Sequence, residues 1–209
     1  MKVSVSFIKS KNSPEETINK LNNTDCDYLH VDVMDGNFVE NKNFGFSEFL
    51  EWQKDNEKML DVHLMCSNPK KYIKEYINLN TEYITVHAEV EKDLKELISL
   101  IHCYGLNAGL SIKPNTPVSK IKDYLYDIEQ VLIMSVEPGK GGQKFISDVV
   151  PKIAELKKLR EENGYNFVIS IDGGINNETI NEVKDCDMVV SGSYICMNDD
   201  YQDKINSLR

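Results

Sequence analysis

Short apolar runs alternate with amphipathic segments along the whole 209-residue chain, and this alternation limits its possible folds more than any other feature. The apolar runs are rich in Val, Ile and Leu, as strands are, and each is followed by helical periodicity after a turn. The units repeat at a spacing of roughly 25 residues, which predicts successive βαβ units and a parallel sheet. The predicted strands are Lys2–Ile8, Tyr28–Met34, Met59–Met65, Glu82–His87, Asn107–Ile112, Gln130–Val136, Phe167–Ile171 and Met188–Val190.

Capping signals mark several helix ends. Ser13-Pro14-Glu15-Glu16 combines an N-cap serine, a proline at the first helical position and a capping-box glutamate, and Gly105 is typical of a helix end. The remaining predicted helices are Phe46–Trp52, Lys70–Ile77, Lys92–His102, Thr116–Tyr124, Ser147–Glu162, Asn176–Val183 and Asp199–Leu208.

Eight β/α units predict an α/β fold, a compact (β/α)8 TIM barrel, with residues 1–209 as a single domain. TIM barrels typically have about 250 residues, so the loops must be short. The alternative is an open doubly wound sheet, although no G-x-G-x-x-G follows the first predicted strand.

Composition excludes several classes of partner. The net charge of −10 argues against nucleic acid and anionic membranes. The five cysteines are scattered and form no C-x-x-C pair, which favours a reducing compartment over a disulfide framework or a zinc cage. No apolar run reaches the length of a membrane span. We therefore expect a cytoplasmic protein.

Imidazole and carboxylate side chains gather at the ends of the predicted strands. His30 and Asp32 lie two apart in HVDVMDG and share one face of their strand, where burial is costly unless they are paired or bound to metal. His63 lies near the end of the third strand, and Asp172 follows the seventh. Functional groups of TIM barrels lie at this end of the strands. The set His30, Asp32, His63 and Asp172 suits one divalent metal ion, Zn²⁺, Fe²⁺, Mn²⁺ or Co²⁺. The alternative is a group of ordinary buried histidines without a metal.

Two further sets of residues lie at the same strand ends. Glycines follow three consecutive strands, and glycine lets backbone N–H groups approach a phosphate closely. A single glycine pair is equally typical of a tight turn. Methionines at three strand ends predict an apolar floor that excludes water from a reactive intermediate, or alternatively plain core filler. These residues are Gly139, Gly141, Gly142, Gly173, Gly174, Gly192 and Ser193 in the first set, and Met34, Met65 and Met134 in the second.

The segments LHVDVMDGNFV, LDVHLM, ITVHAE, LIMSVEPGKGGQKF, SIDGGIN and VSGS resemble the ribulose-phosphate 3-epimerase family. The resemblance implies a phosphosugar substrate, with interconversion of D-ribulose 5-phosphate and D-xylulose 5-phosphate through a 2,3-enediolate. By similarity, His30, Asp32, His63 and Asp172 bind the metal, and Asp32 and Asp172 are also the acid/base pair. Ser6 matches a serine that touches substrate, and Gly139–Gly142 with Lys140, Gly173, Gly174, Gly192 and Ser193 match the phosphate and substrate loops. His87 matches a histidine of the fourth strand whose role is open, and we expect a homo-oligomer.

Four single positions depart from the family pattern, Val5, Glu40, Lys113 and Lys140, and so do the run SFIKSKN and the segment Tyr194-Ile195-Cys196. None belongs to the expected metal set, but several border the expected substrate pocket. Two alternatives therefore stay open. One is a 3-epimerase of a related ketose phosphate such as allulose 6-phosphate, and the other is a diverged phosphosugar-binding protein without turnover.

Overall fold

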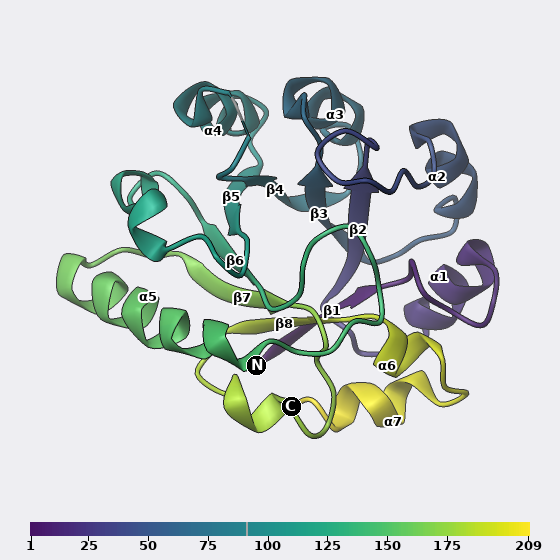
Figure 1. Ribbon diagram of the computed structural model, residues 1–209. Coiled ribbons are helices and arrows are strands. Elements are labelled where there is room, and N and C mark those ends of the chain that lie inside the picture. The colour runs from purple at the N-terminus through teal and green to yellow at the C-terminus, as the bar shows by residue number, and fades with distance from the viewer. Residues whose placement is uncertain (91) are drawn as a thin grey trace.

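Eight parallel strands close into a barrel in the computed structural model, which describes residues 1–90 and 92–209 (Figure 1). The strands follow chain order around the barrel, and β1 pairs with β8 to close it. The predicted TIM barrel is therefore confirmed and the open doubly wound sheet is wrong. The strands are β1 (Lys2–Ser6), β2 (Tyr28–Met34), β3 (Met59–Met65), β4 (Thr81–His87), β5 (Asn107–Ile112), β6 (Gln130–Met134), β7 (Val168–Asp172) and β8 (Met188–Ser191).

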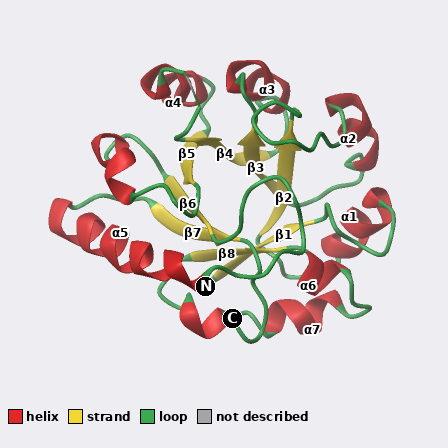
Figure 2. Cartoon of the chain, in the orientation of Figure 1, coloured by secondary structure: helices red, strands yellow, loops and turns green. Residues whose placement is uncertain are grey.

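The helices surround the barrel (Figure 2). At the start of α1 the predicted capping box is present: the Ser13 side chain accepts from the Glu16 N–H, and the Glu16 side chain accepts from the Ser13 N–H. Gly105 has a φ of 74° just beyond α4, as a helix end requires. The α-helices are α1 (Pro14–Asn22), α2 (Phe46–Trp52), α3 (Pro69–Tyr76), α4 (Leu94–Cys103), α5 (Val150–Asn163), α6 (Ser193–Cys196) and α7 (Tyr201–Asn206).

Two predicted α-helices are wrong. The segment Thr116–Tyr124 forms two short 3-10 helices, η1 (Val118–Lys120) and η2 (Lys122–Tyr124). The Lys152 ammonium donates to three carbonyls of the preceding loop, 113–116, which holds that loop out of a helical path.

The segment Asn176–Val183 forms only one 3-10 turn, η4 (Ile180–Glu182). Here the Asn176 side chain accepts from the N–H groups of Glu178 and Thr179, and the Thr179 hydroxyl accepts from the Asn176 N–H. These side-chain bonds compete with the backbone bonds of a helix.

Two other predicted helices need smaller corrections. The helix predicted over Ser147–Glu162 begins with a 3-10 turn, η3 (Ser147–Val149), before α5. The last helix is shorter than Asp199–Leu208 because the Asp200 side chain accepts from the Asp203 N–H and caps α7 there. The one-turn helix α6 was not predicted.

The interior of the barrel is polar where β2 meets β3. The register of this pair sets His30 opposite Asp61 and Asp32 opposite His63, and all four residues are buried. The apolar core lies mainly between the strands and the helices, where Leu and Ile side chains of the strands are fully buried. The barrel therefore has an apolar outer layer around a polar centre.

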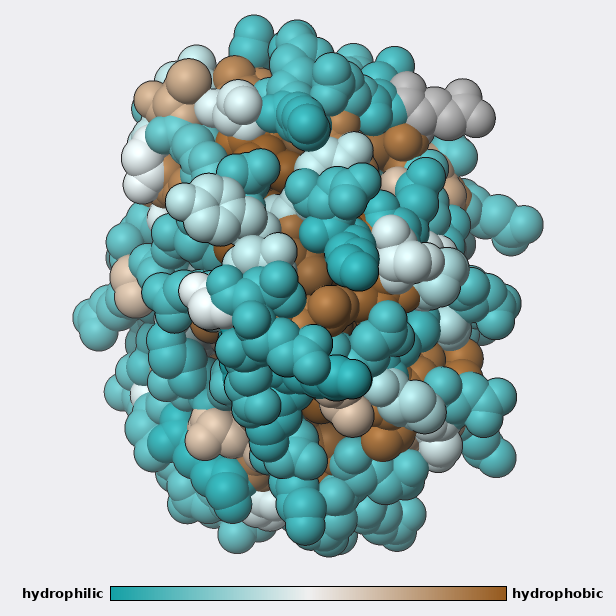
Figure 3. Space-filling view, turned by 90° about the vertical axis from the view of Figure 1, so that its left-hand side faces the viewer, coloured by the Kyte–Doolittle hydropathy of each residue, from teal (hydrophilic) through white to brown (hydrophobic). Residues whose placement is uncertain are grey.

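The outer surface is mostly hydrophilic on the face seen in Figure 3, with smaller hydrophobic areas between the polar side chains. Across the described residues, no helix combines the length and the apolar character needed to span a membrane.

Phe49 is the anchor of the short helix α2. Its ring is fully buried and packs near the rings of Phe7, Phe44 and Tyr76, with centroid distances of 6.1, 5.8 and 5.6 Å. We expect Phe49→Ala to lower the free energy of unfolding by about 3–5 kcal/mol because it leaves a cavity that the barrel cannot fill. Chemical denaturation measures this change. The control is Tyr104→Ala, at a residue that is 49% exposed, for which we expect about 1 kcal/mol or less. Equal losses in the two variants would contradict this role for Phe49.

Candidate active site

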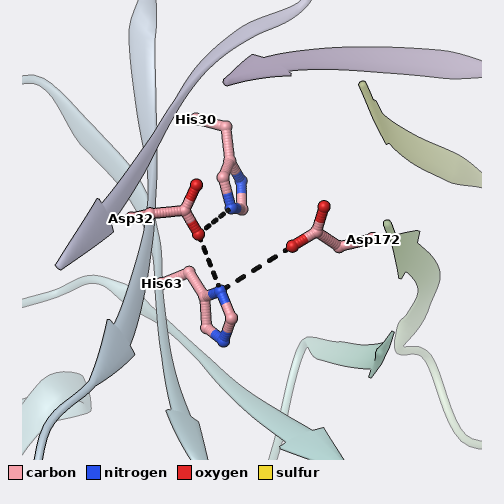
Figure 4. Close-up of side chains that lie close together, drawn as sticks. All are labelled: His30, Asp32, His63 and Asp172. Atoms are coloured by element: carbon pink, nitrogen blue, oxygen red, sulfur yellow. Dashed lines mark hydrogen bonds and ion pairs between the residues drawn. The ribbon is translucent and has the colours of Figure 1, made fainter. Parts of the chain in front are cut away.

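Two histidines and two aspartates converge at the carboxyl ends of the strands (Figure 4). His30 and Asp32 come from β2, His63 comes from β3, and Asp172 is the last residue of β7. One donor atom from each residue lies within 4.8 Å of those of the others. The first three are buried, whereas the Asp172 side chain is 17% exposed. The structure thus brings together the four residues that were predicted to bind a metal.

The donor atoms of this cluster fit a divalent cation. His63 Nδ1 lies 3.1 Å from Asp32 Oδ1 and 4.0 Å from Asp172 Oδ2. His30 Nδ1 lies 2.8 Å from Asp61 Oδ2, and because a carboxylate accepts, this nitrogen carries the proton. His30 Nε2 makes no hydrogen bond within residues 1–90 and 92–209 and lies 3.3 Å from Asp32 Oδ1, so it presents a lone pair to the cluster once the ring has lost its second proton. A metal ligand needs such a nitrogen, oriented by a carboxylate on its other side.

The two aspartates of the cluster have opposite pKa shifts. Burial acts to raise the pKa of Asp32, but His30 and His63 outweigh it and hold this pKa well below its usual range. Burial, followed by the negative charge of Asp32, raises the pKa of Asp172 to about 6. Two carboxyl groups whose environments separate their pKa values are suited to act as base and acid.

The pKa of His30 is shifted upward. Burial acts to lower it, but the carboxylates of Asp32 and Asp61 outweigh burial and hold the pKa well above its usual range. Without a cation, His30 and Asp172 therefore both hold a proton in weakly acidic solution.

Asp61 is a buried carboxylate that sequence analysis missed. It accepts from the Ser4 hydroxyl at 2.8 Å and from the Gln130 amide at 3.4 Å, in addition to its contact with His30. The signal was present in MLDVHLM, because alternation places Asp61 on the same face as His63.

Two further polar side chains hold the backbone of the aspartates. The Asn43 amide donates to the Asp32 carbonyl at 2.7 Å and accepts from the Met34 N–H at 3.0 Å. The Ser135 hydroxyl lies 2.8 Å from the Asp172 carbonyl and 2.7 Å from that of Gly173. No local pattern links these residues to the strand ends that they hold.

A cleft of about 600 Å³ opens above the cluster and is lined by Asp32 and Asp172. The segment between β6 and α5 arches over this end of the barrel (Figure 1). The walls of the cleft include all the residues predicted to contact substrate or phosphate. Their roles stay predictions, and the residues are Ser6, Gly139, Lys140, Gly141, Gly142, Gly173, Gly174, Gly192 and Ser193. The predicted apolar floor, Met34, Met65 and Met134, also lines the cleft and is buried.

Glycine is required at two positions of the cleft wall. A Cβ on Gly174, where φ is +68°, would lie 2.5 Å from the backbone nitrogen of Phe145. A Cβ on Gly192 would lie 2.9 Å from the Ser6 carbonyl oxygen. The loop after β7 therefore approaches the backbone of the segment between β6 and α5, and the loop after β8 approaches the backbone at the end of β1.

The four single departures from the family pattern lie in different places. Val5 is fully buried in the core, and Glu40 is exposed and does not line the cleft. The Lys113 ammonium lies 4.3 Å from the centre of the Phe38 ring. Of the four, Lys140 lines the cleft.

Comparison with known proteins agrees with this geometry. The model of the ribulose-phosphate 3 epimerase family matches residues 2–196. Ribulose-phosphate 3-epimerase of Bacillus subtilis is 38% identical over 187 residues, covering 88% of this chain and 86% of the relative. The enzyme of the same name from Aquifex aeolicus is 39% identical over 172 residues, covering 81% and 78%.

A solved structure of Mycobacterium tuberculosis tryptophan synthase has a TM-score of 0.70 at 10% identity, covering 99% of this chain and 91% of that one, which shows the shared fold alone. The family model and the relatives reach further, because the model matches residues 2–196, which include all eight strands, and the relatives share 38–39% of their residues with this chain over most of its length. The chain therefore belongs to the ribulose-phosphate 3-epimerase family and is an isomerase.

Proposed function

We propose that this protein is a metal-dependent 3-epimerase that interconverts D-ribulose 5-phosphate and D-xylulose 5-phosphate. The observation that carries the proposal is the pair of carboxylates with opposite pKa shifts, Asp32 and Asp172, at the floor of the cleft. Family membership supports the reaction class and the substrate.

Inversion at C3 needs a proton acceptor on one face of the sugar and a proton donor on the other. Asp32 reaches the cluster from β2 and Asp172 from β7, so they approach it from different sides (Figure 4). Ionised Asp32 takes the C3 proton, and Asp172 in its protonated form returns one to the opposite face. The aspartates exchange these roles in the reverse direction. Such acid–base assistance contributes about 10²–10⁴-fold in rate.

The residues His30, Asp32, His63 and Asp172 would hold the cation. When bound, a divalent cation stabilises the negative charge that develops on the sugar oxygens. The Ser6 hydroxyl donates to Asp32 Oδ2 at 2.9 Å, which keeps that carboxylate aimed at the cleft.

The remaining cleft residues orient and shield the substrate. Met34, Met65 and Met134 present an apolar surface that keeps water from the enediolate. The backbone at Gly173–Gly174 and Gly192–Ser193 borders the cleft, where TIM barrels frequently bind phosphate.

A metal-supplemented epimerase assay, with coupled detection of xylulose 5-phosphate, tests the proposal. We expect turnover of ribulose 5-phosphate and exchange of solvent deuterium into C3, because the proton is removed and replaced. A higher kcat/KM for allulose 6-phosphate would overturn the pentose assignment. Binding of the phosphosugar without exchange, with metal bound, would overturn catalysis altogether.

Replacing the carboxyl group of Asp172 with an amide tests its role in proton transfer separately from its role in stability. We expect Asp172→Asn to lower kcat by about 10²–10⁴-fold because the amide cannot exchange the proton. The same assay and a thermal melt measure the two effects. Asp123→Asn, at an exposed residue outside the cleft, is the matched control and should keep wild-type turnover. Near wild-type rates in both variants would exclude Asp172 from the proton transfer.

Cation affinity should depend on pH. The pKa of Asp172 is raised to about 6 and that of His30 lies well above its usual range, so both hold protons below pH 6. Both protons compete with a cation for these groups, so protonation weakens cation binding. Apparent Zn²⁺ affinity should therefore fall as the pH drops below 6, by up to about 100-fold per pH unit for two protons.

Calorimetry in buffers of different ionisation enthalpy counts the protons that Zn²⁺ releases at pH 5.5. Asp172→Asn should reduce this count by about one. Affinity that does not change between pH 7.5 and pH 5.5 would contradict the prediction.

A further inference from the structure

His63 is the first in a chain of three hydrogen-bonded side chains, followed by His87 and then Glu89, on the side away from the cleft. His63 Nε2 lies 2.9 Å from His87 Nε2, and His87 Nδ1 lies 3.0 Å from Glu89 Oε2. Both rings are fully buried, and the Glu89 side chain is 19% exposed. The proton transfer proposed above uses neither His87 nor Glu89.

Counting protons along this chain decides which nitrogen of His63 is free. The Glu89 carboxylate accepts, so His87 donates from Nδ1 and has a lone pair on Nε2. A hydrogen bond between the two Nε2 atoms needs one proton, which must then belong to His63. In a neutral His63 ring, Nδ1 is then the nitrogen with the lone pair, and this atom lies 3.1 Å from Asp32 Oδ1, within the cluster of donor atoms.

Glu89 is held as an acceptor at both oxygens. Its Oε1 accepts from the Lys113 N–H at 2.8 Å, and its Oε2 faces His87. Burial acts to raise the pKa of Glu89, but the hydrogen bonds from His87 and the Lys113 amide outweigh it and lower the pKa to about 2. An ionised carboxylate therefore ends the chain.

The outer end of the chain is anchored and covered. The Lys152 ammonium donates to the carbonyls of Lys113, Pro114 and Thr116 at 2.7–2.9 Å, which fixes the loop that supplies the Lys113 amide. The Phe38 ring lies 4.7 Å from the His87 ring and shields it. Such anchoring gives Glu89 a fixed position from which to orient the two rings.

We propose that Glu89 and His87 are positioning residues that hold His63 in its Nε2–H tautomer, so that Nδ1 is the nitrogen that binds the cation. The proposal rests on the metal dependence proposed above. It assigns opposite ring atoms to the two histidines of the cluster, because Asp61 leaves Nε2 free in His30.

Nitrogen NMR of the full-length wild-type protein, labelled with ¹⁵N-histidine, tests the tautomer directly. We expect His63 to be protonated at Nε2 in the chelator-treated protein and in the Zn²⁺-loaded protein, with Zn²⁺ shifting the Nδ1 resonance. A proton on Nδ1 after chelation, or a shift by Zn²⁺ at Nε2, would overturn the proposal. The measurement does not involve turnover, so an inactive wild-type protein would overturn the proposed epimerase reaction without altering this result.

Glu89→Gln tests the source of the orientation. The glutamine amide has one acceptor oxygen, so it must turn its NH₂ group toward either the Lys113 N–H or His87. In the second case the glutamine donates to His87 Nδ1, so His87 carries its proton on Nε2 and donates to His63 Nε2. The proton of His63 is then on Nδ1. We expect a mixture of His63 tautomers and Zn²⁺ affinity weakened about 10- to 100-fold, measured by chelator competition.

The matched control is His102→Gln, which removes the histidine of another histidine–glutamate pair, in which His102 Nε2 lies 3.0 Å from Glu129 at the surface. It should leave both readouts at wild-type values. A purely structural role of Glu89 would lower stability without changing the tautomer or the affinity, and that result would overturn the proposal. The wild-type spectrum decides the tautomer even where the Glu89 variant fails to fold.

Discussion

The structure depends on the pairing of the buried carboxylates and imidazoles that β2 and β3 place inside the barrel. Asp32 and Asp61 alternate with His30 and His63 across these two strands, so each carboxylate lies beside an imidazole. Removing one partner from a buried ion pair typically costs about 3–5 kcal/mol because the other charge is left uncompensated. The register of β2 against β3 is therefore tied to the site itself, because a slip of either strand by one residue would turn its two groups out of the interior.

Two groups of this buried polar network lack a favourable partner in the protein itself, and both belong to the cluster that would hold the cation. His30 Nε2 is buried without a hydrogen-bond partner in the described part of the chain, and the pKa of Asp172 is raised to about 6. Both features oppose stability in the free protein. Both are relieved by a positive charge placed among the four donors, which explains why a polar centre of this kind persists inside an otherwise apolar barrel.

Local periodicity was sufficient for the strands and for the residues that face the cleft. Alternation in HVDVMDG places Asp32 inward and Asp35 outward, and in the structure Asp35 accepts from the backbone N–H groups of Asn37, Phe38 and Ser67. The helices predicted over 116–124 and 176–183 failed because side chains bind the backbone at or just before them, and the hydrogen bonds of Lys152 to loop 113–116 span 36 residues or more. Glu89 was missed for a similar reason, since its partners come from β4 and from the loop after β5.

The four single departures from the family pattern lie apart from the cluster of histidines and aspartates. Lys113 contributes to the positioning chain through its backbone amide, which any residue except proline supplies, so its side chain can vary without disturbing His63. Val5 lies in the core, and Glu40 is away from the cleft lining. Lys140 lines the cleft, at the rim and not at the cluster. The departure that lines the cleft, Lys140, and the cluster of His30, Asp32, His63 and Asp172 therefore lie in different layers of the barrel.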